Sequence, residues 1–183
     1  MKNYVEFKTI HDIIECQLVT IRHKRRQWDM GPALSEPQRL IKFNTVGIQM
    51  DRKSGKSFYT INRLLEDPNA VAFMLRDDDR MFNIRNYELT FGIDLPESVT
   101  DRIYTLLQVS CGILDKDKKL IKQSFDTVYI DDADQYLRLL GNLKVYELIA
   151  SYNPSVEVVL VSNFVPEPVI CKVNKWWLNE SLG

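Results

Sequence analysis

The chain has 183 residues, of which 45% are hydrophobic and 27% charged, a composition typical of a globular protein with one hydrophobic core. Its formal net charge of -1 excludes a protein whose whole surface is a nucleic-acid footprint, although a local basic patch is compatible with it. The sequence has no run of about 18 apolar residues, as a membrane-spanning helix requires, and its polar N-terminus is unlike a signal peptide. Three isolated cysteines predict neither a disulfide framework nor a zinc site. We therefore expect a cytoplasmic protein with no membrane partner.

The N-terminal region ends in a basic run. Residues 4–22 predict a short helix, with an edge strand left open, because their apolar positions follow no clean period. The basic residues at the end of this stretch and just after it have two interpretations. They form the solvated end of a helix, or they contact nucleic-acid phosphates, with Trp28 available for stacking on a base. In the second interpretation the DNA contacts come from Arg22, Lys24, Arg25 and Arg26.

Residues 45–65 predict a strand, a short loop and a helix. A β-branched run leads into a loop with Gly55, Lys56 and Ser57, and apolar residues at helical spacing follow. In such a turn, backbone N–H groups and the positive end of the helix form a concave site for phosphate oxygens. Gly55 lets the backbone approach, the Lys56 ammonium reaches the β and γ phosphates, and the Ser57 hydroxyl holds Mg²⁺. The pattern is incomplete, because the full motif requires a glycine where Met50 stands.

The regions around this loop complete a βαβ unit. Residues 38–43 predict a short helix, and the Gln38 amide in it either pairs with an adenine edge or is an ordinary surface group. Residues 70–75 are a continuous apolar run, typical of a strand buried on both faces of a parallel sheet. Residues 81–109 are mostly helical in pattern, and we expect a helix carrying Ile103 near their end.

A second apolar strand candidate, residues 125–130, ends in Asp131 and Asp132. Two carboxylates directly after a buried strand can hold Mg²⁺ and orient an attacking water. We expect Asp131 to be the metal-side residue. Asp132 is expected to polarise the water, a role in which glutamate is more usual.

A third strand candidate, residues 156–161, follows one helical segment over residues 136–149 and ends in Ser162 and Asn163. Its polar end can hydrogen-bond a γ-phosphate or the attacking water. We therefore expect Lys56, the acidic pair and Asn163 to face one triphosphate at the same edge of the sheet.

The order of these motifs resembles a P-loop NTPase of the additional-strand type, a group that holds helicases, AAA+ proteins and viral DNA-packaging motors. The loop DRKSGKS is similar to the Walker A loop of large terminase subunits, TVYIDDAD to Walker B, and VVLVSNF to the strand carrying the sensor or coupling motif. Gln38 stands where those motors have an adenine-reading glutamine. The resemblance covers residues 35–165 and implies a nucleotide-binding loop made of the following residues: Asp51, Arg52, Lys53, Ser54, Gly55, Lys56 and Ser57.

The resemblance and the residues together predict an α/β domain with three layers and a mostly parallel sheet of about five strands. We expect one P-loop NTPase domain over residues 1–183, with an N-terminal extension at 1–37, a nucleotide-binding core at 38–165, and a terminal strand and Trp-containing tail at 166–183. The expected function is a Mg²⁺-dependent ATPase acting on DNA, packaging-motor-like or helicase-like and encoded by a phage or mobile element, in which case it lies in the host cytoplasm.

Two other functions remain open at this point. A nucleoside or nucleotide kinase would need an acceptor pocket and an arginine-rich lid, neither of which the sequence identifies. A non-hydrolysing assembly module with the NTPase fold fits the missing first glycine and the aspartate at position 132. For an ATPase, a neighbouring subunit is expected to supply an arginine in trans, and the candidates are Arg76, Arg80, Arg102 and Arg138.

Overall fold

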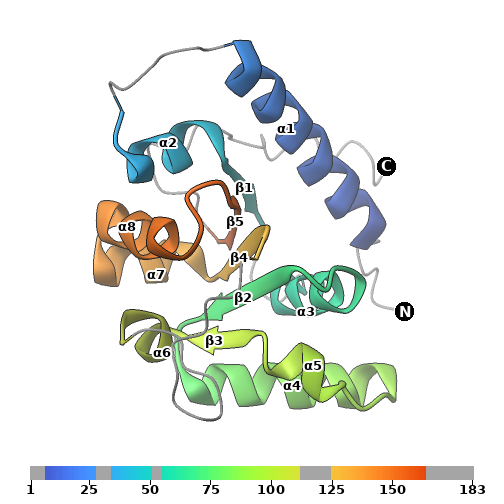
Figure 1. The fold of residues 1–183 in the computed structure, drawn as a ribbon. Coiled ribbons are helices and arrows are strands. Elements are labelled where there is room, and N and C mark those ends of the chain that lie inside the picture. The colour runs from blue at the N-terminus through green and yellow to red at the C-terminus, as the bar shows by residue number, and fades with distance from the viewer. Residues whose placement is uncertain (1–6, 28–33, 51–54, 112–124, 164–183) are drawn as a thin grey trace.

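The computed structural model describes residues 7–27, 34–50, 55–111 and 125–163. These residues form a five-stranded sheet in which all neighbouring strands are parallel, in the order β1-β5-β4-β2-β3. The predicted α/β class, with a parallel sheet of about five strands between two helical layers, is confirmed (Figure 1). The strands are β1 (Thr45–Gln49), β2 (Ala70–Met74), β3 (Ile103–Thr105), β4 (Thr127–Asp131) and β5 (Glu157–Ser162).

Helices cover both faces of the sheet. One hydrophobic cluster joins the sheet to α1 (Phe7–Gln27), α3 (Lys56–Glu66), α4 (Asp77–Phe91) and the short α5 (Glu97–Thr100). The opposite cluster includes α2 (Glu36–Phe43), α6 (Leu106–Ser110), α7 (Ala133–Leu140) and α8 (Asn142–Tyr152). Strands buried on both faces explain why β2, β4 and β5 read as continuous apolar runs.

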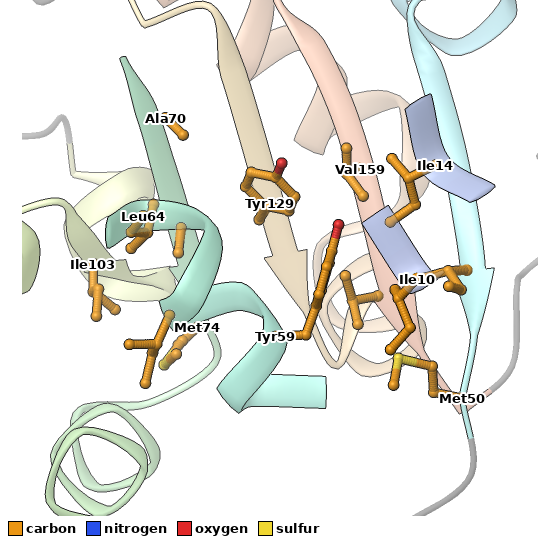
Figure 2. Packing of buried hydrophobic residues seen from close by; sticks show 14 of the residues in the cluster. Ile10, Ile14, Met50, Tyr59, Leu64, Ala70, Met74, Ile103, Tyr129 and Val159 are labelled. Atoms are coloured by element: carbon orange, nitrogen blue, oxygen red, sulfur yellow. The ribbon is translucent and has the colours of Figure 1, made fainter. Parts of the chain in front are cut away.

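The N-terminal segment is one 21-residue helix, so the edge strand left open for residues 4–22 is wrong. Ile10, Ile14, Leu18 and Ile21 are spaced as one face of a helix and are buried in the same cluster as β1 and β5. Figure 2 shows Ile10 and Ile14 over the sheet, with Met50 beyond the end of β1. The predicted extension thus contributes to the core of the described part of the chain.

Two other expectations along the chain are corrected. The helix expected to carry Ile103 is the edge strand β3, where β-branched and aromatic side chains pair with β2. The single helix expected over residues 136–149 is two helices, α7 and α8, separated at Gly141. Gly141 has a φ of 81°, which a glycine adopts without strain.

The terminal strand and the Trp-containing tail expected over residues 166–183 lie outside the described residues. Among the residues that are described, none of the helices combines the length and the apolar character needed to cross a membrane.

Candidate functional site

The loop after β1 ends at Gly55, the N-cap residue of α3. Gly55 has φ 92° and ψ 21°, in the left-handed region where a side chain would be strained. Lys56 is the first residue of the helix, and its side chain is only 9% exposed. The structure therefore places an ammonium group at the positive end of a helix, a combination that favours an anion.

The Lys56 ammonium contacts side chains from two other segments. Its Nζ donates a hydrogen bond to Oδ1 of Asn163 at 2.9 Å, just after β5. It also lies 3.9 Å from Oδ1 of Asp132, which follows β4. The structure thus brings together the three segments that the sequence expects to face one triphosphate.

Asp131 is the last residue of β4, and it is buried. Its carboxylate accepts a hydrogen bond from the Ser57 hydroxyl, and its Oδ1 accepts the Asp132 backbone N–H at 3.1 Å. Burial raises the pKa of Asp131 from 3.8 to about 6, outweighing these hydrogen bonds and the attraction of Lys56, while the Asp132 charge raises it further. The buried carboxylate and the Ser57 hydroxyl are the two residues expected to bind metal.

Asp132 has φ 48° and ψ 45°, which makes it the one non-glycine residue with positive φ in the described part of the chain. This left-handed conformation costs a non-glycine residue about 1 kcal/mol, and Asp and Asn tolerate it best. Such strain is a feature of functional sites. The sequence did not predict this left-handed backbone. An aspartate between a buried strand and the start of a helix is the one available signal, because aspartate is among the residue types that adopt this conformation most often.

The sheet order explains why these groups meet. Strand β5 lies between β1 and β4, so the carboxyl ends of the three strands are neighbours at one edge. Helix α3 leaves β1 on one face of the sheet, and α7 leaves β4 on the other. In open α/β sheets, the crevice where connections part to opposite faces is the usual place for a ligand.

The donor set at this edge fits Mg²⁺. The ion prefers oxygen ligands, and it usually takes one or two from the protein while phosphate and water supply the others. Asp131 and Ser57 provide one carboxylate and one hydroxyl already in contact. Among the described residues, no group of three or more His, Cys, Asp or Glu side chains could hold a metal ion. One carboxylate and one hydroxyl are a protein contribution of the size that Mg²⁺ usually takes, with phosphate and water as its further ligands.

Of the other residues predicted to contact the nucleotide, the structure describes Gln38 but not the loop residues before Gly55. Asp51, Arg52, Lys53 and Ser54 lie outside the described residues. Gln38 is exposed in the first turn of α2, where its side-chain oxygen accepts the Ser35 backbone N–H at 3.0 Å and caps the helix. Reading an adenine edge with both halves of this amide would require the capping bond to break.

Of the four basic residues predicted to contact DNA, the structure describes the side chain of Arg22 alone. Arg22 is held by Glu157 through two hydrogen bonds, Nε to Oε1 at 2.5 Å and Nη2 to Oε2 at 2.6 Å. Its guanidinium therefore belongs to an ion pair that joins α1 to β5. The side chains of Lys24, Arg25 and Arg26 lie outside the described residues.

The four candidates for an arginine supplied in trans have different surroundings. Arg102 donates to the backbone carbonyls of Leu64, Asp67, Ala70 and Ser98. That position is at the amino ends of β2 and β3, away from Lys56, so Arg102 has a structural role. Arg76 pairs with Asp79, and Arg80 pairs with Asp77, both within α4 or its N-cap. Arg138 is exposed on α7.

No model of a known protein family matches this chain, and no curated protein matches it. Among solved structures, the chain is similar to a hypothetical ATP-dependent RNA helicase from Sulfolobus tokodaii, with 17% sequence identity and a TM-score of 0.44. The match covers 81% of this chain and 51% of that one, so this chain spans about half the length of the helicase. Similarity at this level does not establish a family, and the functional assignment rests on the site geometry.

Proposed function

We propose that this chain binds ATP with Mg²⁺ at the carboxyl edge of its sheet and hydrolyses it. The observation that carries the proposal is the meeting of Lys56 with Asn163 at 2.9 Å and with Asp132 at 3.9 Å, beside the buried Asp131. A cation at a helix N-terminus can bind phosphate, and a carboxylate with a hydroxyl can coordinate Mg²⁺. A further acid beside them can orient the attacking water.

The contacts of Lys56 suggest an order of events. Asn163 holds the Lys56 ammonium through a hydrogen bond, and the Asp132 carboxylate neutralises its charge. An incoming γ-phosphate competes for that ammonium, because its charge exceeds that of one carboxylate. Asp132 then accepts a hydrogen bond from a water in line with the γ-phosphate, and the Asn163 amide donates one to the γ-phosphate. Bound Mg²⁺ would neutralise charge that develops on the phosphate oxygens.

A thermal shift measurement tests nucleotide binding. At a concentration 100 times its Kd, a ligand adds about 2.7 kcal/mol of stability, or roughly 5 to 10 °C in Tm for a chain of this size. We expect Mg-ATP to produce this shift in the wild type and not in Lys56→Ala. Asp126→Asn, which changes an exposed residue just before β4, at the edge of the sheet opposite the site, is the control and keeps the shift.

The same samples separate the alternative functions. Formation of ADP and inorganic phosphate without any acceptor supports an ATPase. Formation of ADP only in the presence of an acceptor, which takes the γ-phosphoryl group, would indicate a kinase. A Tm shift that needs Lys56 but comes with no turnover would indicate a module that binds without hydrolysis. Absence of any shift would contradict the proposal and favour a module that keeps the fold for assembly.

We propose further that the ATPase acts on DNA, in the manner of the packaging motors and helicases that its motifs resemble. Support comes from the basic run at the C-terminal end of α1, where Lys24, Arg25 and Arg26 follow Arg22 in the sequence. Phosphate contacts by such residues make binding salt-dependent.

A further inference from the structure

The outer face of α4 carries large apolar side chains that no described element covers. Met81, Phe82 and Leu89 are 61%, 67% and 71% exposed. The inner face of the same helix is also apolar, with Ile84 and Tyr87 buried against the sheet. A surface helix of a globular protein normally has one apolar face. The second face of α4, which we call the α4 stripe (Met81, Phe82 and Leu89), therefore needs an explanation.

The position of the α4 stripe makes it accessible to another molecule. Helix α4 lies at the outer end of the molecule, beyond the edge strand β3 (Figure 1). With these exposures the stripe presents roughly 400 Å² of apolar surface, within the range at which a patch on a monomer is often functional.

Two oppositely charged residues lie beside the stripe, and their spacing makes this helix face complementary to a second copy of itself. Asp78 and Arg85 are both exposed, seven residues or about 10 Å apart along the helix, and they share the face of the stripe. They lie symmetrically about a point between Met81 and Phe82. When two copies of α4 pack antiparallel about a two-fold axis at that point, Asp78 faces Arg85 of the second copy, and Met81 faces Phe82 of the second copy. The helix face is therefore self-complementary, as an isologous interface must be.

Most of the neighbouring charges are paired with one another, and Arg76 also attracts Asp78. Asp77 pairs with Arg80, and Asp79 pairs with Arg76, in the same turn of α4. Within the residues that the structure describes, no ion pair involves Arg85. We propose that the α4 stripe is an interface between two copies of this chain, in which two Asp78–Arg85 pairs flank a centre of Met81 and Phe82. This dimer does not depend on the proposed ATPase function.

Sedimentation equilibrium of the full chain, from about 1 to 100 µM, tests the proposal in the concentration range of a weak dimer. We expect a monomer–dimer equilibrium in the wild type. Phe82→Asp should weaken the dimer by at least about tenfold, because it places an unpaired charge at the centre of the interface. Leu139→Asp is the matched control: it changes a side chain that is 63% exposed on α7, on the opposite face of the sheet, and should leave the equilibrium unchanged.

A charge exchange then tests the geometry. Asp78→Arg and Arg85→Asp should each weaken the dimer several-fold, because each places like charges opposite one another. The double variant, with both substitutions, should recover it, since the pairs re-form with the charges reversed. Urea unfolding of each variant shows that the monomer remains folded. A chain that is monomeric throughout, a Phe82→Asp variant that dimerises like the wild type, or a double variant that fails to recover would each overturn the proposal.

Discussion

At the scale of single residues, the site is held together by its own charges. Lys56 is nearly buried, and an ammonium in that position is tolerated because Asn163 and Asp132 contact it. Residue types and their order predicted this group, because Lys56 stands between a polar loop and a helix, and the acidic pair and Asn163 come at the ends of apolar runs. The left-handed backbone of Asp132 was not predicted, since it depends on the exact angle at which α7 leaves β4.

Asp131 gives a prediction about pH. Its pKa is raised from 3.8 to about 6 by burial, so ionisation costs about 3 kcal/mol more in the folded protein than in the unfolded chain, at about 1.4 kcal/mol per tenfold change. The folded state therefore binds this proton more tightly, and the contribution of Asp131 to stability falls as pH rises from about 4 to about 6. We expect Asp131→Asn to be the more stable protein at pH 8 without ligand, by at most about 3 kcal/mol, and to lose this advantage below pH 4.

Urea unfolding between pH 4 and 8 measures this difference. Asp126→Asn, at an exposed residue just before the same strand, is the control and should follow the wild type at every pH. If Asp131→Asn were less stable than the wild type at pH 8, the hydrogen bonds of the carboxylate would outweigh its burial, and the direction of the pKa shift would be wrong.

At the scale of elements, the buried strands and the edge strand β1 were predictable, and the edge strand β3 was not. Strands β2, β4 and β5 have apolar side chains on both faces, and such runs are recognisable without any tertiary context. Strand β3 has only three residues, and its pairing with β2 decides its conformation. A run as short as Ile-Tyr-Thr fits a turn of helix equally well.

Helix α1 gives a prediction about DNA. One arginine near its basic end, Arg22, has a structural role, because it is hydrogen-bonded to the Glu157 carboxylate. Charge reversal of Arg25 and Arg26 together should weaken DNA binding and reduce its salt dependence by about two phosphate contacts, with little change in stability. Arg22→Ala is the matched control: it should lower stability through the lost ion pair and change DNA affinity much less. Fluorescence anisotropy over a salt series measures both, and equal affinity in the wild type and the charge-reversed protein would rule out this helix end as the DNA contact.

At the scale of the whole molecule, the order of strands in the sheet creates the site. The three motifs are separated by about 75 and 30 residues in the sequence, yet they meet because β5 is placed between β1 and β4. No local pattern contains that order. The resemblance to additional-strand NTPases supplied the expectation that the three motifs converge, but no strand order, and composition and periodicity predicted only that parallel strands would be present.

The central claim is that these three segments serve one triphosphate, and a calorimetric titration of Mg-ATP tests it directly. Lys56→Ala, Asp131→Ala and Asn163→Ala each change one segment, and each should weaken binding at least about tenfold, the loss of one charge-assisted contact. The loss for Asn163→Ala should be smaller with ADP, which lacks the γ-phosphate. Asp126→Asn, at the opposite edge of the sheet, should bind like the wild type. Unchanged Mg-ATP affinity in all three site variants, or no binding to the wild type, would contradict the claim.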